Sequence, residues 1–230
     1  MINDYLVIAV VPARGGSKSI HYKNLHPLNG KPLIFWSIDC ALKTPEIDRL
    51  IVSTEDDRIR KAALDFGAEV YLRPEILASD NSLVADTIRH LWKQLLSEGA
   101  KKVIFVLLEP TSPFRTPQLI RNCLRRLVNE NIDSIATFHD AEINPERTWQ
   151  INGGVPQPFI PGSIPWMPRQ LLMPAYQLNG AIYAFYPDRL PEEIPNLLFG
   201  KMGAEIVDAD QVIDIDTAKD FVIANAIFQS

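Results

Sequence analysis

Cysteine and histidine are scarce in this chain of 230 residues, which has two of the former and four of the latter. Cys40 and Cys123 each lie in an apolar, helix-like pattern, without a Cys-x-x-Cys or Cys/His spacing. Zinc sites and disulfide frameworks need such spacings, so we expect two buried thiols in a reducing compartment. The isolated histidines form no Ser-His-Asp arrangement, and nucleophilic catalysis by Ser or Cys is therefore not supported.

Long apolar runs and an excess of positive charge are also missing. No apolar run reaches the roughly 20 residues that cross a bilayer. Asn3 and Asp4 stand where a leader segment would be basic. The net charge of −5 argues against an extended surface for nucleic acid or anionic membranes. We expect a cytoplasmic protein with no nucleic-acid or membrane partner, and a single domain over residues 1–230.

The first 138 residues alternate between strand-like and helix-like patterns, which predicts βαβ units. We expect a three-layer α/β fold with a mainly parallel, twisted sheet. Because ligands gather beyond the carboxyl ends of such strands, the loops at 12–24, 53–57 and 109–116 should share one rim. The expected strands are 6–11, 50–54, 69–72, 102–108, 133–138, 180–185 and 204–207, and the expected helices are 33–42, 56–66, 84–96, 117–128 and 217–228.

From about 140 to 178 the chain becomes rich in proline and loses the alternating pattern. Gly153 and Gly154 indicate a hairpin turn. We interpret this segment as an inserted arm, because its apolar residues, among them Trp149, Phe159 and Trp166, need burial. We expect a partner subunit to bury them.

The loop at 12–18, with the sequence PARGGSK, follows the first buried strand and is suited to hold a polyphosphate. Its glycines let the backbone approach and turn N–H groups toward oxygen, and its cations offset phosphate charge. The loop has neither Walker A spacing nor a Gly-x-Gly-x-x-Gly fingerprint. Taken alone, an ordinary surface turn is the more common explanation.

Asp214-Ile215-Asp216 is the second strong signal. In an extended segment, residues two apart point to the same side, so both carboxylates converge. Mg²⁺ is commonly held by one or two carboxylates together with substrate phosphates. Capping of the last helix by Asp216 is the competing explanation, and one residue can do both.

Other polar residues are less specific. Glu109 and Arg115 sit at the expected rim, where a rigid turn with Thr116 as a helix cap is the simpler explanation. The loop at 77–82 is equally a helix-start loop. Arginines in the arm can hold a carboxylate or simply be solvated.

Taken together, these segments resemble the acylneuraminate cytidylyltransferases, or CMP-sialic acid synthetases, in family order over nearly the whole chain. The matching stretches are 12–18 with Lys23 and Asn24, 30–33 (GKPL), 51–54 (IVST), 73–74 with 77–80 (LASD), 110–113 (PTSP) with 115–116, 179–183 (NGAIY) and 213–217 (IDIDT).

The resemblance implies a nucleotide-diphosphosugar-transferase-like fold that dimerises through the inserted arm, as a homodimer or a dimer of dimers. It implies a transfer of CMP from CTP to the 2-hydroxyl of a nine-carbon 2-keto-3-deoxy sugar acid. Sialic, legionaminic and pseudaminic acids belong to this class of ulosonic acids, and pyrophosphate is the second product.

The resemblance also assigns roles. Arg14, Lys23 and Asp216 would be catalytic, and Asp216 or a metal-bound water would take the hydroxyl proton. Mg²⁺ would be bound by Asp214 and Asp216. The nucleotide would meet Ala13, Arg14, Gly15, Ser17, Lys18, Lys23, Asn24, Arg73, Ser79 and Asp80. The sugar would meet Glu109, Arg147, Arg169, Gln177 and Asn179.

Three departures from the family pattern concern the substrates. Glu109 stands where sialic-acid enzymes commonly have Gln, and Gln177 stands where several relatives have Arg. The stretch 81–84 (NSLV) replaces a Thr/Ser-rich continuation. The loss of one positive charge favours a legionaminate- or pseudaminate-type acid over N-acetylneuraminate.

Two alternatives stay open. A Kdo-type cytidylyltransferase shares the fold and chemistry, but its phosphate loop usually lacks Gly-Gly-Ser-Lys. A catalytically silent nucleotide-sugar-binding module would have no need of the acidic pair, so Asp214 and Asp216 speak against it.

Overall fold

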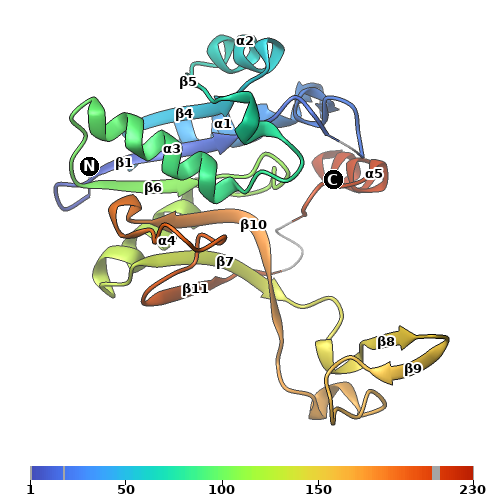
Figure 1. Cartoon of the computed structure of the whole chain (residues 1–230). Helices are drawn as coiled ribbons and strands as arrows, with labels where there is room; N and C mark the ends of the chain where they lie inside the picture. Colours follow the sequence, from blue (N-terminus) through green and yellow to red (C-terminus); the bar gives the residue numbers. More distant parts are fainter. Residues whose placement is uncertain (1, 18, 209–212, 230) are drawn as a thin grey trace.

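A seven-stranded mixed sheet forms the centre of the computed structural model, which describes residues 2–17, 19–208 and 213–229 (Figure 1). Its strands follow the order β11-β7-β10-β6-β1-β4-β5. They are β1 (Leu6–Pro12), β4 (Arg49–Thr54), β5 (Glu69–Leu72), β6 (Val103–Leu107), β7 (Ser134–Asp140), β10 (Tyr176–Phe185) and β11 (Met202–Ile206).

All neighbouring strands pair in parallel except β10, which runs antiparallel to both β6 and β7. The mainly parallel sheet predicted from the sequence is confirmed. The reversed direction of β10 was not predicted, and it has a simple cause. The chain leaves the sheet at the carboxyl end of β7, forms the arm, and returns to the sheet at that same end as β10, which must therefore run in the opposite direction to β7.

Helices cover both faces of the sheet, which confirms the three layers. Alternate residues of β1 point to opposite faces, so Val7, Ala9 and Val11 join one apolar core while Ile8 and Val10 join the other. The first core also contains residues of α1, α2 and α4, and the second contains residues of α3. The helices are α1 (Leu33–Leu42), α2 (Asp57–Asp65), α3 (Val84–Ser97), α4 (Pro117–Asn129) and α5 (Ala218–Gln229).

Two helix caps fix the loops that follow β4 and β6. Asp56 accepts hydrogen bonds from the backbone N–H groups of Arg58 and Ile59 at the start of α2. Thr116 accepts one from the N–H of Leu119, with Pro117 in the first turn of α4, as the sequence predicted. Both caps hold the polar segments at the carboxyl ends of the strands in fixed positions.

A short hairpin of β2 (Pro27–Leu28) and β3 (Lys31–Pro32), which the sequence did not predict, anchors the last helix. Leu28 and Leu33 pack with Phe221 and Ala224 of α5 in a third apolar cluster. The hairpin thereby brings the end of the chain beside the loop that follows β1.

The arm stands away from the sheet (Figure 1) and contains the predicted hairpin, formed by β8 (Trp149–Asn152) and β9 (Val155–Pro158). Gly153 and Gly154 have positive φ at its turn. Large apolar side chains of the arm are exposed in the single chain, including Trp166 at 84% and Ile151 at 70%. Such exposure is unusual for a monomer.

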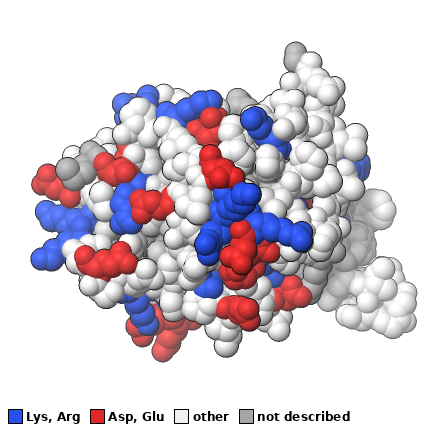
Figure 2. All heavy atoms as spheres, turned by 90° about the horizontal axis from the view of Figure 1, so that it is seen from above, with Lys and Arg blue, Asp and Glu red and all other residues white. Residues whose placement is uncertain are grey.

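The face of the molecule seen in Figure 2 has no large patch of one charge, because Lys and Arg side chains are interspersed with Asp and Glu. In the described part of the chain, no helix combines the length and the apolar character needed to cross a membrane.

Phe105 tests the packing of the sheet against α3. Its ring is fully buried and lies 6.0 Å from both Trp92 and Phe185. Phe105→Ala should lower the free energy of unfolding by about 3–5 kcal/mol in urea titrations, because it leaves a cavity. Val222→Ala, at a position 70% exposed on α5, is the control and should change it by less than about 1 kcal/mol. Equal losses in both variants would contradict this packing.

Candidate functional site

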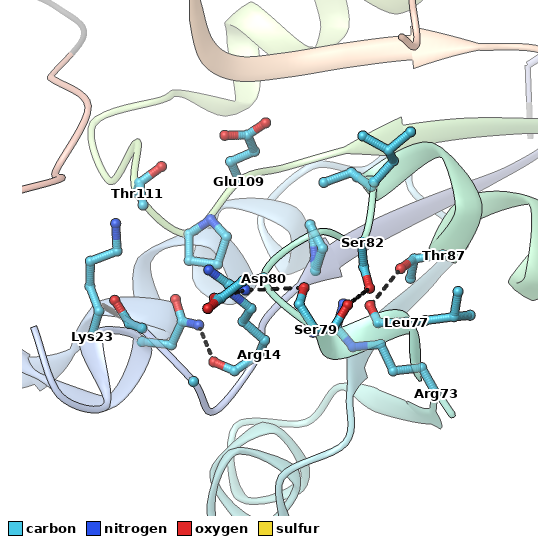
Figure 3. A pocket seen from close by; sticks show the side chains of 17 residues that line it. Arg14, Lys23, Arg73, Leu77, Ser79, Asp80, Ser82, Thr87, Glu109 and Thr111 are labelled. Carbon is cyan, nitrogen blue, oxygen red and sulfur yellow. Dashed lines mark hydrogen bonds and ion pairs between the residues drawn. The ribbon is translucent and has the colours of Figure 1, made fainter. Parts of the chain in front are cut away.

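A cavity of about 320 Å³ opens at the carboxyl ends of the central strands. Segments that follow β1, β5 and β6 contribute to its wall, so the loops at 12–24 and 109–116 share one rim as predicted. The loop at 53–57, expected at the same rim, contributes no lining residue. In Figure 3, Lys23 and Thr111 lie at one end, and Ser82 and Thr87 lie at the other. The cavity is lined by Pro12, Arg14, Gly16, Ser17, Lys23, Asn24, Arg73, Leu77, Ser79, Asp80, Ser82, Leu83, Val84, Thr87, Glu109, Pro110 and Thr111.

The loop after β1, residues 13–17, is held from two sides. Gly15 donates its backbone N–H to Glu55 Oε1 at 2.7 Å, and Asn24 Nδ2 donates to the carbonyl of Arg14 at 3.0 Å. A Cβ atom on Gly15 would lie 2.6 Å from Asp56 Oδ2, so this position requires glycine. The expectation that both loop glycines offer their N–H groups to phosphate is therefore wrong for Gly15, whose N–H anchors the loop.

Other residues of this loop differ in their access to the cavity. Arg14, Gly16 and Ser17 line it, whereas Ala13 is fully buried and donates its N–H to the carbonyl of Ser53. Lys18, also predicted to meet the nucleotide, lies outside the described residues. The loop thus presents mainly side chains and the Gly16 backbone to the cavity.

Arg14 links the loop to the segment after β5. Its Nη1 donates to Asp80 Oδ1 at 3.0 Å and to the carbonyl of Ser79 at 3.3 Å (Figure 3). Ser79 in turn forms a hydrogen bond with the Ser82 hydroxyl. The predicted nucleotide residues Arg14, Ser79 and Asp80 therefore share one wall of the cavity.

Lys23 connects the cavity to the acidic pair. Its Nζ donates to Asp216 Oδ1 at 2.9 Å and to the carbonyl of Ile215 at 3.0 Å. Asp216 does not cap α5. Asp220 accepts from the backbone N–H groups of Asp216 and Thr217, while the Thr217 hydroxyl accepts weakly from the N–H of Asp220. The Asp216 carboxylate, 70% exposed, is free of a capping role.

Asp214 is the other carboxylate of the acidic pair. Burial raises the pKa of its carboxyl, a hydrogen bond from Thr111 opposes that shift, and the negative charge of Asp216 adds to it. The described residues contain no cluster of three or more His, Cys, Asp or Glu that could hold a metal. Two neighbouring carboxylates whose charges repel nevertheless fit Mg²⁺, which takes its remaining ligands from phosphate and water.

Glu109 is, with Asp80, an acidic residue of the cavity lining (Figure 3). Burial, followed by the charge of Asp214, raises the pKa of its carboxyl to about 7. A Cβ atom on Gly180 would lie 2.9 Å from Glu109 Oε2, and Gly180 has a φ of +67°. Glycine at that position therefore leaves room for the carboxyl group.

Arg115, expected at the rim, is instead buried beneath it. Its guanidinium donates to the Ser37 hydroxyl and to the carbonyls of Ala181 and Glu109. Burial lowers its pKa to about 10. Arg115 thus fixes the backbone of the loop after β6 and does not face the cavity.

The predicted sugar residues do not all meet in one chain. Asn179 is buried and directly precedes Gly180, which adjoins the Glu109 carboxyl. Its Oδ1 accepts from the Thr137 hydroxyl and the N–H of Ala181, while its Nδ2 has no partner among the described residues. Gln177 accepts from the N–H of Glu142 at the base of the arm.

Arg147 and Arg169 line a second cavity, of about 700 Å³, within the arm. Asp140 and Glu142 belong to the same lining, and Arg147 also donates to the carbonyl of Met167. The structure therefore separates these two arginines from the cavity that contains Glu109.

Sequence reasoning missed two contributors to the site. Thr111 lines the cavity and binds Asp214, and Glu55 holds the loop after β1. Both lie in segments that were expected at the rim, but their side-chain directions depend on the neighbouring strands. The position directly after a parallel strand was the available signal for Glu55.

Comparison with known proteins places these features in a family. A family model described as Cytidylyltransferase matches residues 8–150. An N-acylneuraminate cytidylyltransferase of Streptococcus agalactiae serotype V is 29% identical over 94% of this chain and 51% of its own length. The chain therefore spans about half the length of that relative.

Other relatives match over almost their whole length. The CMP-N,N'-diacetyllegionaminic acid synthase of Legionella pneumophila is 29% identical, over 97% of this chain and 96% of that protein. The pseudaminic acid cytidylyltransferase of Campylobacter jejuni is 25% identical, over 96% of each.

Solved structures agree in fold. A CMP:2-keto-3-deoxy-manno-octonic acid synthetase complexed with CTP superposes with a TM-score of 0.72 at 20% identity, covering 97% of this chain and 98% of that one. A 4-diphosphocytidyl-2C-methyl-D-erythritol synthase gives 0.71 at 14% identity, covering 98% and 99%. Together with the family model, these likenesses confirm the predicted resemblance, and the chain belongs to the cytidylyltransferase family.

Proposed function

We propose that the protein transfers CMP from CTP to the 2-hydroxyl of a nine-carbon 2-keto-3-deoxy sugar acid and releases pyrophosphate. The observation that carries this proposal is that Arg14 and Lys23 line one cavity, and that two lining residues reach the acidic pair: Lys23 binds Asp216, and Thr111 binds Asp214. Cations at a Gly-rich loop suit a triphosphate, and neighbouring carboxylates suit its metal ion. The names of the curated relatives support CTP and ulosonic acids as substrates.

The chemistry is an in-line displacement at the α-phosphorus. The sugar 2-hydroxyl oxygen forms the new P–O bond as the bond to the pyrophosphate oxygen breaks, and the hydroxyl proton goes to the Asp216 carboxylate. Arg14 and Lys23 offset the charge on the phosphates and on the leaving group. Fixed charges of this kind lower the barrier without reorganising during the reaction.

Mg²⁺ is part of the proposal, with Asp214 and Asp216 as its protein ligands. When bound, the ion would neutralise phosphate charge and orient the triphosphate. Lys23 and the metal would share the carboxylate of Asp216, because Lys23 Nζ lies 2.9 Å from Asp216 Oδ1. The position of the Lys23 side chain would therefore depend on the position of the bound triphosphate.

A pyrophosphate-release assay with CTP and Mg²⁺ tests the function against a panel of sugar acids. Release of pyrophosphate with a nine-carbon acid supports the proposed function. Release only with the eight-carbon acid Kdo would show that the protein is a Kdo-type cytidylyltransferase instead. Tight binding of CTP without release for any acid would favour a silent binding module.

We propose a legionaminate- or pseudaminate-type acid as the sugar. No hydrogen bond reaches the Glu109 carboxyl from the described side chains and backbone, so it has free acceptor capacity for a hydroxyl or amide N–H of the substrate. Asn179, with its unpartnered buried Nδ2, would offer a donor nearby.

We also propose that the chain forms a homodimer through its arm, either alone or within a dimer of dimers. The exposed Trp166, Ile151 and Met173 support this arrangement. Arg147 and Arg169 would then act on the sugar from a partner's arm, since within one chain they lie apart from Glu109.

Asp214→Asn should lower kcat by on the order of 100-fold or more, because it removes one of two charged oxygen ligands. Pyrophosphate release at saturating Mg²⁺ measures the loss, and circular dichroism verifies the fold. Asp65→Asn, at the exposed end of α2, is the matched control and should keep the normal rate. Near-normal turnover of the Asp214 variant would contradict the metal assignment.

Glu109→Gln should shift substrate preference toward N-acetylneuraminate. An amide keeps one acceptor oxygen and adds two donors, which changes the substrate groups it can bind. The ratio of kcat/KM for N-acetylneuraminate to that for diacetyllegionaminate should rise by at least about tenfold. KM for CTP is the internal control. An unchanged ratio would show that Glu109 does not select the sugar.

Trp166→Glu should convert dimers into monomers, because a charge at the centre of an apolar interface is expensive to bury. Light scattering after gel filtration measures the mass. Leu64→Glu, at a position 53% exposed on α2, is the control and should leave the mass unchanged. A dimer that persists with Trp166→Glu would overturn the interface assignment.

A further inference from the structure

Glu55 links two segments of the cavity wall, although it is not itself a lining residue of the cavity. It directly follows β4, which lies between β1 and β5 in the sheet. The loop after β1 begins with Ala13, and Arg73 directly follows β5. The order of the strands thus puts a carboxylate between two segments of the cavity wall.

Each oxygen of Glu55 binds one of these neighbours. Oε1 accepts the backbone N–H of Gly15 at 2.7 Å, and Oε2 accepts Nε of Arg73 at 3.0 Å. The two side chains are largely enclosed, with exposed fractions of 17% for Glu55 and 6% for Arg73. Hydrogen bonds with a charged partner are strong in such surroundings, and removal of one partner leaves the other charge uncompensated.

Arg73 has donor capacity left over. Its Nη2 is buried without a partner among the described residues, yet Arg73 lines the cavity. Glu55 fixes Nε, and therefore fixes the plane of the guanidinium and the direction of its other nitrogens. Arg14 also carries its positive charge close enough to act on Arg73, and the carboxylate of Glu55 offsets that repulsion.

We propose that Glu55 is a positioning residue for the nucleotide. It holds the loop after β1 and the guanidinium of Arg73 in the arrangement that CTP requires, and it does not itself touch CTP. This inference rests on the proposed function, because it presumes that the cavity binds CTP. It predicts that Glu55 governs nucleotide affinity and has little effect on the sugar.

The test compares Glu55→Gln with a matched control, Glu69→Gln. Arg49 and Glu69 form an ion pair between the same two strands, β4 and β5, at their opposite ends, with a closest distance of 2.6 Å. The control therefore breaks a similar link without touching the cavity. Calorimetric titration with CTP and Mg²⁺, without any sugar acid, gives the Kd of each variant, and thermal unfolding reports the fold.

Glu55→Gln should raise the Kd and KM for CTP by at least about tenfold, since the amide keeps one acceptor oxygen and turns an NH₂ group toward the other donor, which breaks the link between Gly15 and Arg73. KM for the sugar acid should change less than twofold, and Glu69→Gln should leave all three values unchanged. Glu55→Asp, which keeps the charge on a shorter side chain, should recover part of the affinity and serves if Glu55→Gln does not fold.

A double-mutant cycle tests whether Glu55 acts through Arg73. In the background of Arg73→Met, adding Glu55→Gln should weaken CTP binding by a smaller factor than it does in the wild type. Equal factors in both backgrounds would overturn coupling through Arg73.

The remaining outcomes are also decisive. Normal CTP affinity in Glu55→Gln, or an equal loss in Glu69→Gln, would overturn the positioning role while leaving the proposed function intact. Failure of the wild type to bind CTP would overturn the proposed function and this inference with it.

Discussion

The parallel pairing of β6, β1, β4 and β5 is the constraint on which the site depends. Parallel strands bring their carboxyl ends to one edge, so the residues that follow each strand meet there. Glu55 uses this arrangement by bonding to both neighbouring segments at once, through Gly15 and Arg73. Arg115, buried beneath the cavity, holds the loop after β6 in place through the carbonyl of Glu109 and ties it to β10 through the carbonyl of Ala181. The cavity is therefore shaped by buried polar contacts that the sheet order makes possible.

Charge balance follows from the same geometry. Each cation that lines the cavity in the described part of the chain has an acidic neighbour: Arg14 pairs with Asp80, Lys23 with Asp216 and Arg73 with Glu55. The first two pairs have exposed carboxylates, so a triphosphate and its metal can compete for these partners. The third pair is enclosed, which suits a permanent structural link. The site thus combines two exchangeable ion pairs with one fixed pair.

The elements could be predicted from sequence because hydrophobic periodicity and turn residues agree along the chain. Helix α1 was predicted with its observed bounds, and the arm hairpin with its Gly153–Gly154 turn. The direction of β10 could not be predicted, because it depends on where the arm leaves the sheet. For the site, the sequence correctly predicted that the loops after β1 and β6 meet at one rim. It could not show that the N–H of Gly15 binds Glu55 or that Arg115 is buried, because both depend on contacts with other segments of the chain. The capping role weighed for Asp216 was wrong, because Thr217 and Asp220 cap α5 reciprocally.

Above all, we propose that the cavity recognises a metal-bound cytidine triphosphate. Calorimetric titration of the wild-type protein with CTP and with CMP, each in the presence and absence of Mg²⁺, tests it most directly. We expect CTP to bind at least about tenfold more tightly than CMP, and we expect the removal of Mg²⁺ to erase most of this difference. Equal affinities for CTP and CMP, unaffected by Mg²⁺, would contradict it.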